Sequence, residues 1–179
     1  MEAKWRTESI IVEYKDRFTG EVTYSATGHW FDPQGVQVVE VRLALYPTQV
    51  ELSSWDCSTQ CDAKYRATAT PETVAFLKGA AAATLHHLLK IAQVPAEIPL
   101  LATVTEMLGD AEVLQHREGD TPGMARARLL QHYAKLGFRE AKPDEAVLKS
   151  NLDAEVITTV GTYLKTVQPR AEHVVLLSR

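Results

Sequence analysis

Two acidic side chains are candidates for general-base chemistry in this chain. Glu40 and Glu51 lie on neighbouring predicted strands, on the face opposite the apolar residues. A carboxylate held beside a reacting group can take a proton from it. His29, next to Trp30, is another candidate base. Ordinary solvated surface carboxylates also explain Glu40 and Glu51.

The two cysteines, Cys57 and Cys61, form a C-x-x-x-C pair just after an apolar run. A structural zinc ion takes four ligands, and the chain has no second cysteine pair and no H-x-x-x-H. We therefore expect two free thiols in a loop and no metal, with a local disulfide or a metal site as the alternatives. The hydrolase motif G-x-S-x-G is absent.

Residues 133–138, which read Tyr-Ala-Lys-Leu-Gly-Phe, predict a specific local structure. They are typical of the last turn of a helix, a glycine stop and an aromatic residue that begins a strand. Gly137 suits the left-handed conformation after a helix, and Phe138 can then pack back on the last turn.

This segment resembles the Y-x-K-L-G-F signature of the GNAT superfamily, the acyl-CoA-dependent N-acyltransferases. The resemblance covers Ala111–Glu140, about one sixth of the chain. Arg126 stands where the family usually has an asparagine, and Leu129 where it usually has an alanine. A subset of GNAT-like proteins lacks the asparagine, and Ala111–Glu140 looks like that subset.

The resemblance implies roles for particular positions. Tyr133 would be the general acid that protonates the leaving thiolate, and the backbone around Gly79 would hold the pyrophosphate of the acyl-CoA. The segment Ala111–His116 would be the splayed strand along the pantetheine. The implied cofactor-binding residues are Lys78, Gly79, Ala80, Val113, Leu114 and Arg126. The alternatives are a core role for Tyr133 and a close-packing role for Gly79 inside an alanine-rich helix.

The first 55 residues predict a four-stranded antiparallel meander. Val39, Val41, Leu43 and Leu45 alternate with Glu40 and Arg42, which is the clearest strand pattern in the chain. The predicted strands are Ser9–Tyr14, Glu21–Phe31, Val36–Leu45 and a fourth around Val50, Leu52 and Trp55. The short link at Lys15–Thr19 leaves no room for the two helices that GNAT members place there.

The rest of the chain predicts mainly helices. Thr70 and Pro71 are a helix start, and we expect one helix from there to Ala92, and another from Thr121-Pro122 to Leu136. Further expectations are an ambiguous segment Ile98–Leu108, a short strand Ala111–His116, a helix from Asp153 to Pro169 and a terminal strand His173–Leu177.

Composition restricts the class of protein. The chain has 179 residues and a net charge of −4, with no long basic run, so we expect one domain spanning 1–179 and no nucleic-acid partner. No apolar window reaches the length of a membrane span, and Met1–Thr7 lacks a signal-peptide core. We expect an intracellular protein, cytoplasmic by default with an organelle not excluded, and a homodimer as one possible assembly.

The resulting prediction is an α+β fold with a mixed, mostly antiparallel sheet flanked by helices, of GNAT-like type. The predicted function is transfer of an acyl group from acyl-CoA to an amine, with acetyl-CoA as the expected donor. Tyr133 would be the general acid, and Glu40 or Glu51 the general base. The first alternative is a catalytically inactive GNAT-like module that binds a protein partner. The second is a protein that binds a small apolar ligand, lined by Trp30, Phe31 and Trp55.

Overall fold

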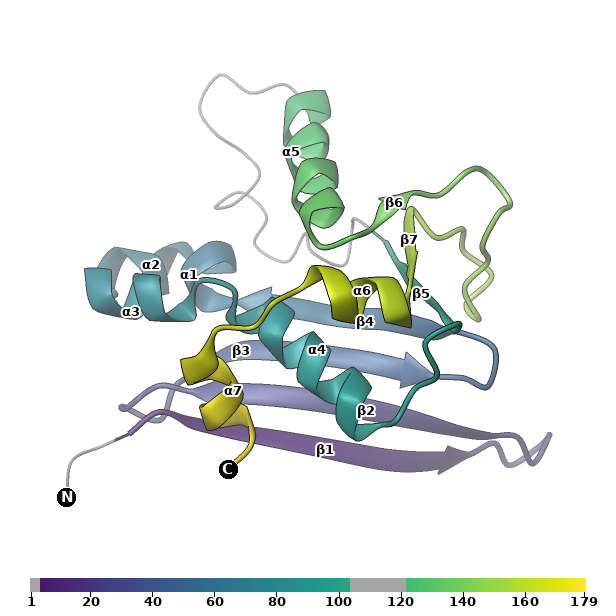
Figure 1. The fold of residues 1–179 in the computed structure, drawn as a ribbon, viewed down its shortest axis with the longest axis horizontal. Helices are drawn as coiled ribbons and strands as arrows, with labels where there is room; N and C mark the ends of the chain where they lie inside the picture. Colours follow the sequence, from purple (N-terminus) through teal and green to yellow (C-terminus); the bar gives the residue numbers. More distant parts are fainter. Residues whose placement is uncertain (1–3, 104–121) are drawn as a thin grey trace.

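The structure is a computed structural model that describes residues 4–103 and 122–179. It is an α+β fold built on one seven-stranded sheet in the order β1-β2-β3-β4-β5-β7-β6 (Figure 1). All neighbouring strands are antiparallel except β4 and β5, which are parallel. The predicted fold class, a mixed and mostly antiparallel sheet with an N-terminal meander and flanking helices, is confirmed.

The predicted meander is formed by β1 (Arg6–Lys15), β2 (Val22–Phe31), β3 (Gln37–Leu45) and β4 (Val50–Cys57). Tight turns join them, because Asp16 and Asp32 accept backbone hydrogen bonds from the residues that follow them. Gly20 and Gly35 take the positive φ angles of 74° and 82° that these turns require. The β1–β2 link is therefore a turn, as its length predicts.

Three short strands extend the sheet beyond β4. They are β5 (Pro99–Ala102), β6 (Arg139–Glu140) and β7 (Val156–Thr159). β7 lies between β5 and β6 and pairs antiparallel with both. The segment Ile98–Leu108, which the sequence left ambiguous between strand and helix, thus begins as strand β5. Residues 104–121 lie outside the described part of the chain.

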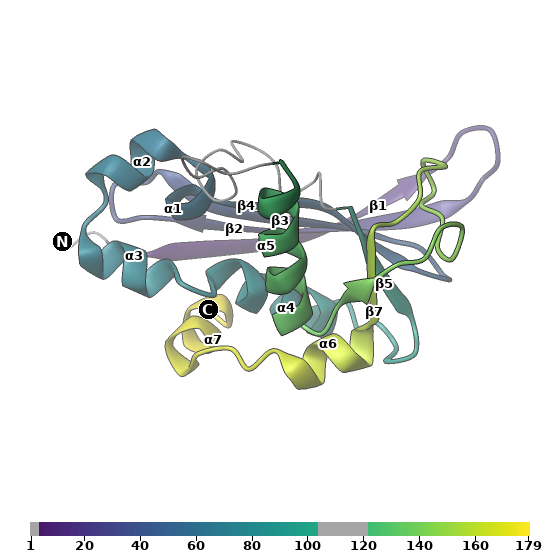
Figure 2. The ribbon, with the colours of Figure 1, turned by 90° about the horizontal axis from the view of Figure 1, so that it is seen from above.

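The helices cover one face of the sheet and one of its ends. Seen from above, α4, α6 and α7 lie on the same side of the sheet (Figure 2). Their bounds are α1 (Ser58–Cys61), α2 (Ala63–Thr68), α3 (Pro71–Leu77), α4 (Ala80–Ile91), α5 (Pro122–Lys135), α6 (Val160–Thr166) and α7 (Ala171–Leu177).

The predicted continuous helix from Thr70 to Ala92 is wrong. Thr70 does cap a helix, since its side chain accepts from the N–H of Thr73, but that helix is α3 and it ends at Leu77. Gly79 has a φ of 80°, a left-handed conformation that an α-helix cannot continue through, and α4 begins at Ala80. The alanine-rich run therefore belongs to a second helix.

Two C-terminal predictions are also wrong. The expected helix from Asp153 begins only at Val160, because Val156–Thr159 pairs with β5 and β6 as β7. Thr159 then caps α6 by accepting from the N–H of Thr162. The expected strand His173–Leu177 is helix α7, in which His173, Leu176 and Leu177 are buried at helical spacing.

The core lies between the sheet and α4. Gly28 on β2 allows the close approach, because a Cβ there would lie 2.4 Å from the Thr84 methyl carbon. Trp30 is fully buried and donates from Nε1 to Thr84 Oγ1 at 2.7 Å. The small side chains at the start of α4, Ala80, Ala81, Ala82 and Ala83, are all buried.

Candidate functional site

The parallel pair β4–β5 is short, and we call the place where this pairing ends, after Glu51 and Leu101, the fork. The two strands pair only at Val50 with Leu100 and at Glu51 with Leu101, although β4 continues to Cys57. A bulge in the β3–β4 register, where Arg42 faces Ser54 and Leu43 faces Leu52, bends β4 at this point. Within the described residues, positions 52–57 of β4 have no strand on the β5 side.

The buried side chain of Trp55 lies on this second half of β4. Trp55 is 3% exposed, and it pairs with Val41 on the strand face that α4 covers. Its indole Nε1 has no hydrogen-bond partner among the described residues. A buried indole N–H usually finds an acceptor, so this donor is available to one.

The start of α4 offers backbone donors. The first N–H groups of a helix have no partner inside the helix, and no side chain caps this one. α4 has 12 residues, so its dipole favours negative charge at Ala80. Lys78 and Gly79 are exposed beside it. The helix break places the predicted pyrophosphate-binding positions at a helix N-terminus.

Two residues of the α7 region hold the α3–α4 junction. Arg170 donates to the carbonyl oxygens of Ala75 at 2.8 Å, Phe76 at 3.3 Å and Lys78 at 3.4 Å. His173 Nε2 donates to the Phe76 carbonyl at 2.7 Å, and burial lowers the pKa of this imidazole. Sequence reasoning missed both, because nothing local marks a contact with residues more than 90 positions earlier.

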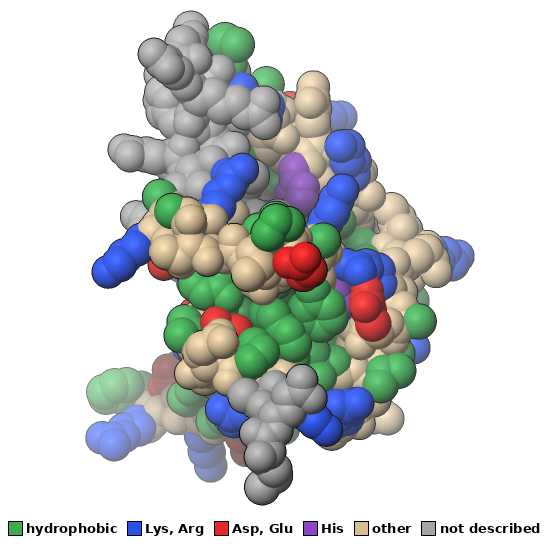
Figure 3. Space-filling view, turned by 90° about the vertical axis from the view of Figure 1, so that its left-hand side faces the viewer, with side chains coloured by type: hydrophobic (Ala, Val, Ile, Leu, Met, Phe, Trp, Pro, Cys, Tyr) green, Lys and Arg blue, Asp and Glu red, His purple; other side chains and the backbone are tan. Residues whose placement is uncertain are grey.

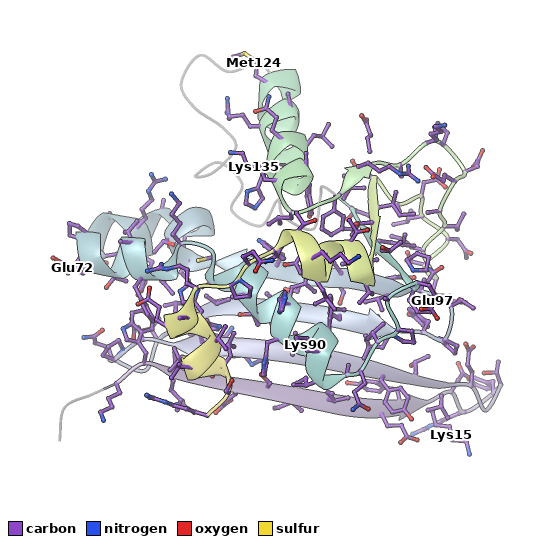
Figure 4. The ribbon with its side chains drawn as sticks, viewed as in Figure 1. Lys15, Glu72, Lys90, Glu97, Met124 and Lys135 are labelled. Carbon is purple, nitrogen blue, oxygen red and sulfur yellow. The ribbon has the colours of Figure 1, made fainter. Side chains whose placement is uncertain are left out.

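The segment 133–138 folds as predicted. α5 ends at Lys135, Gly137 has a φ of 96°, and the Phe138 N–H donates to the Tyr133 carbonyl at 3.1 Å. The rings of Tyr133 and Phe138 pack edge to face with centroids 5.2 Å apart. Figure 4 labels Lys135 at the end of α5 that faces the rest of the fold.

Tyr133 lies in the core. It is 1% exposed, and the Phe138 ring that packs on it also contacts Tyr163, at a centroid distance of 6.0 Å. Tyr163 is fully buried and donates to the Ala82 carbonyl at 2.7 Å, and burial raises its pKa well above the usual value. An aromatic stack thus connects the end of α5 to the first turn of α4.

Glu51 is a buried, hydrogen-bonded carboxylate rather than a solvated one. It is 9% exposed, and its Oε2 accepts from Gln49 Nε2 at 2.6 Å and from the Lys149 N–H at 2.8 Å. Because it pairs with Leu101, it stands at the base of the fork. The surface reading of Glu51 is wrong for this reason.

Glu40 belongs to a separate polar cluster, which we call the β2–β4 cluster. His29 and Glu40 are directly opposite each other on β2 and β3, with Nε2 and Oε1 3.2 Å apart. Arg42 also reaches Glu40 Oε1 at 3.2 Å, and Ser54 donates to Oε2 at 3.3 Å. The structure therefore joins the two candidate bases His29 and Glu40, which sequence analysis named separately.

The structure does not bring Glu40 and Glu51 together. Glu51 pairs with Ala44, four positions along β3 from Glu40, which separates the two backbones by about 13 Å. Of the two, Glu51 is the carboxylate at the fork.

Some predicted positions lie outside the described residues. They are Val113 and Leu114, the whole predicted strand Ala111–His116, and the side chain of Arg126, whose backbone is in α5. Among the described strands, the one that runs parallel to β4 is β5, at Pro99–Ala102.

The apolar lining predicted for a small ligand is wrong. Trp30 and Trp55 are buried in the core at 0% and 3% exposure, and Phe31 lies under the Arg6 guanidinium at 4.2 Å. The described residues include no group of three or more metal-ligating side chains. Cys57 does not lie in a loop, as the sequence suggested, but ends β4, where it is buried with its Sγ 3.3 Å from Thr59 Oγ1.

Comparison with protein-family models finds no match to this chain. Neither the curated proteins nor the solved structures contain a match to it. Among the described residues, no helix has the length and apolar character needed to cross a membrane.

Proposed function

We propose that this chain is an acyl-CoA-dependent N-acyltransferase that moves an acetyl group to an amine. The observation that carries the proposal is the β4–β5 fork, a parallel pairing of only two residue pairs beyond which β4 continues to Cys57. The N-terminus of α4 and the α5 stop at Gly137 support it, because they supply an anion-binding end and the segment that resembles the GNAT signature.

The chain offers a binding path for a long phosphorylated thioester. Lys78 and the α4 N-terminus place positive charge beside the α3–α4 junction, where a pyrophosphate would be held. Positions 52–57 of β4, which no strand among the described residues pairs on the β5 side, would then pair with the amide groups of an extended pantetheine.

Two residues supply the proton transfers in the proposed reaction. Glu51, at the base of the fork, would take a proton from the attacking ammonium. The new bond joins the amine nitrogen to the acyl carbon as the carbon–sulfur bond breaks. Tyr133 would give its hydroxyl proton to the leaving thiolate, and the second proton that the nitrogen loses as the amide forms would restore the Tyr133 hydroxyl.

A second function is favoured by other observations. The turn at 16–21 leaves no helices between β1 and β2, and Tyr133 is buried. A groove of about 500 Å³ lies beside Trp5, Phe76 and Leu176. Figure 3 shows hydrophobic side chains gathered in the middle of one face, with charged side chains around them. These features fit an inactive module that binds a protein partner.

The proposed function is tested by thiol release from acetyl-CoA in the presence of a panel of amines. The proposal requires release that depends on an amine, and Glu51→Gln should slow it by at least tenfold because the carboxylate base is gone. Glu13→Gln, the same change at an exposed position of β1 away from the fork, is the matched control. Release that no amine stimulates favours the binding module.

A further inference from the structure

A second concave site lies at the other end of β4 from the open part of the fork. It is a cavity of about 390 Å³ between the sheet, the end of α4 and the connection to β5. Figure 4 locates it through three labels: Lys90 at the end of α4, Glu97 before β5, and Lys15 at the end of β1. Its main apolar lining comes from Ile11, Tyr24, Leu45, Val50, Ile91 and Ile98.

The lining carries no formal charge. Its only polar side-chain groups are the hydroxyls of Tyr24 and Tyr46 and the amide of Gln93. Ile11 is 42% exposed, Tyr24 43% and Ile91 41%, so large apolar side chains face the opening. Covering them removes apolar surface from water, which is favourable by about 25 cal/mol per Å².

The walls of the cavity are held by backbone hydrogen bonds. One wall is the paired sheet, in which Ile11 lies opposite the buried Ala26. The other wall follows α4 and is fixed by the Val94 N–H bonded to the Leu89 carbonyl at 3.3 Å. Ala96 and Ile98 also accept backbone bonds of 2.9 Å from the first turn of α6. The cavity is therefore preformed, as small-molecule sites usually are.

We propose that this cavity binds a neutral lipophilic small molecule, aromatic or aliphatic, with at most one or two hydrogen-bonding groups. Its volume lies within the range of about 300–1,000 Å³ that such ligands occupy. A charged ligand would find no ion partner in the lining, and desolvating its charge would oppose binding. The site needs neither the fork nor the α4 N-terminus, so it stands independently of the acyltransferase proposal.

The distribution of isoleucines gives a direct test. The chain has five isoleucines, and Ile11, Ile91 and Ile98 line the cavity while Ile10 and Ile157 do not. Isoleucine-methyl NMR spectra are recorded during titration with naphthol, a neutral bicyclic aromatic. We expect saturable shifts of the three lining methyl signals, with the other two unmoved. The anion naphthalenesulfonate should bind at least tenfold more weakly, a difference of about 1.4 kcal/mol.

Adjacent residues of β1 provide a matched pair of variants. Ile11 and Ile10 are both exposed, at 42% and 50%, but successive side chains of a strand point to opposite faces. Ile11→Glu should raise the dissociation constant of naphthol at least tenfold, and Ile10→Glu should leave it within twofold. Ala92→Phe, which fills the cavity from the helix side, is the second variant if Ile11→Glu does not fold.

Three outcomes would overturn the proposal. One is no saturable shift of any lining methyl signal. Another is that Ile11→Glu and Ile10→Glu weaken naphthol binding equally, which would indicate nonspecific binding to the β1 edge. The third is a shift of the lining signals with protein concentration alone, which would mean that a second copy of the chain covers the cavity.

Discussion

At the scale of single residues, two buried polar contacts of this fold depend on specific partners. Trp30 and Thr84 form one such pair in the core, and Thr84 Oγ1 in turn donates to the Ala80 carbonyl at 2.7 Å. Glu51 and Lys149 form another, between β4 and a loop. In both cases, one missing partner would leave a buried group unsatisfied.

Thr84→Val should destabilise the protein by about 1–3 kcal/mol, because it leaves the Trp30 N–H buried without an acceptor. Thr84→Ser keeps the hydroxyl and is the control. Urea unfolding measures both free energies. A Thr84→Val variant as stable as the wild type would show that this hydrogen bond does not contribute to stability.

Tyr133→Phe should reduce the rate of acetyl transfer by about 100-fold without changing acetyl-CoA affinity, because a general acid acts on the leaving thiolate. Tyr65 is the matched control, since its hydroxyl bonds Asp32 at 3.0 Å in another part of the fold. Tyr65→Phe should keep the full rate. An unchanged rate in Tyr133→Phe would leave this tyrosine with a packing role alone.

At the scale of elements, two glycine stops determine where the helices end. Gly137 ends α5, and Gly79 separates α3 from α4. The sequence was sufficient to predict the end of α5, because Gly137 and the aromatic residue that packs behind it, Phe138, are adjacent. The second was missed, because apolar spacing continued through Gly79 and suggested one long helix.

Gly137→Ala should destabilise the protein by about 2–3 kcal/mol. The φ of 96° disfavours any side chain, and a Cβ would lie 2.9 Å from Thr166 Oγ1 on α6. Gly20→Ala is the control, because its φ of 74° carries a similar backbone cost but its Cβ would meet open space. The difference between their free energies of unfolding measures the clash. No difference would mean that α6 adjusts freely.

At the scale of the whole molecule, long-range contacts explain why the fold was more predictable than the site. Alternating apolar residues were enough to predict the meander. The hydrogen bond from the Lys149 N–H to Glu51 joins residues 98 positions apart, and the pairing of His29 with Glu40 depends on strand register. Neither is encoded in a local pattern. The short strand β7 was missed for the same reason, because its partners are β5 and β6.

The stability of the whole fold should fall as the pH drops below about 6.5. Burial lowers the pKa values of His86, His87, His132 and His173 from 6.5. The unfolded chain therefore binds more protons than the folded one. This stabilisation is complete above pH 6.5, the pKa of a histidine in the unfolded chain. It is lost as the pH falls through the lower pKa values that these histidines have in the folded protein.

Thermal unfolding as a function of pH tests this prediction. Glu145, with a pKa lowered to about 2 by Arg139, titrates at much lower pH than an unfolded histidine. His173→Gln retains an N–H donor and removes one titrating group, so its profile should be flatter. A melting temperature that does not change with pH would contradict the account of the buried histidines.

The central claim is that the fork and the α4 N-terminus form an acyl-CoA site, and thermal unfolding with acetyl-CoA tests it most directly. At about 100 times its dissociation constant, a ligand adds about 2.7 kcal/mol, which raises the melting temperature of a domain this size by several degrees. Desulfo-CoA should give a similar shift and ATP none. Lys78→Glu should reduce the shift, whereas Lys64→Glu on α2 should not. No shift at millimolar acetyl-CoA would contradict the claim.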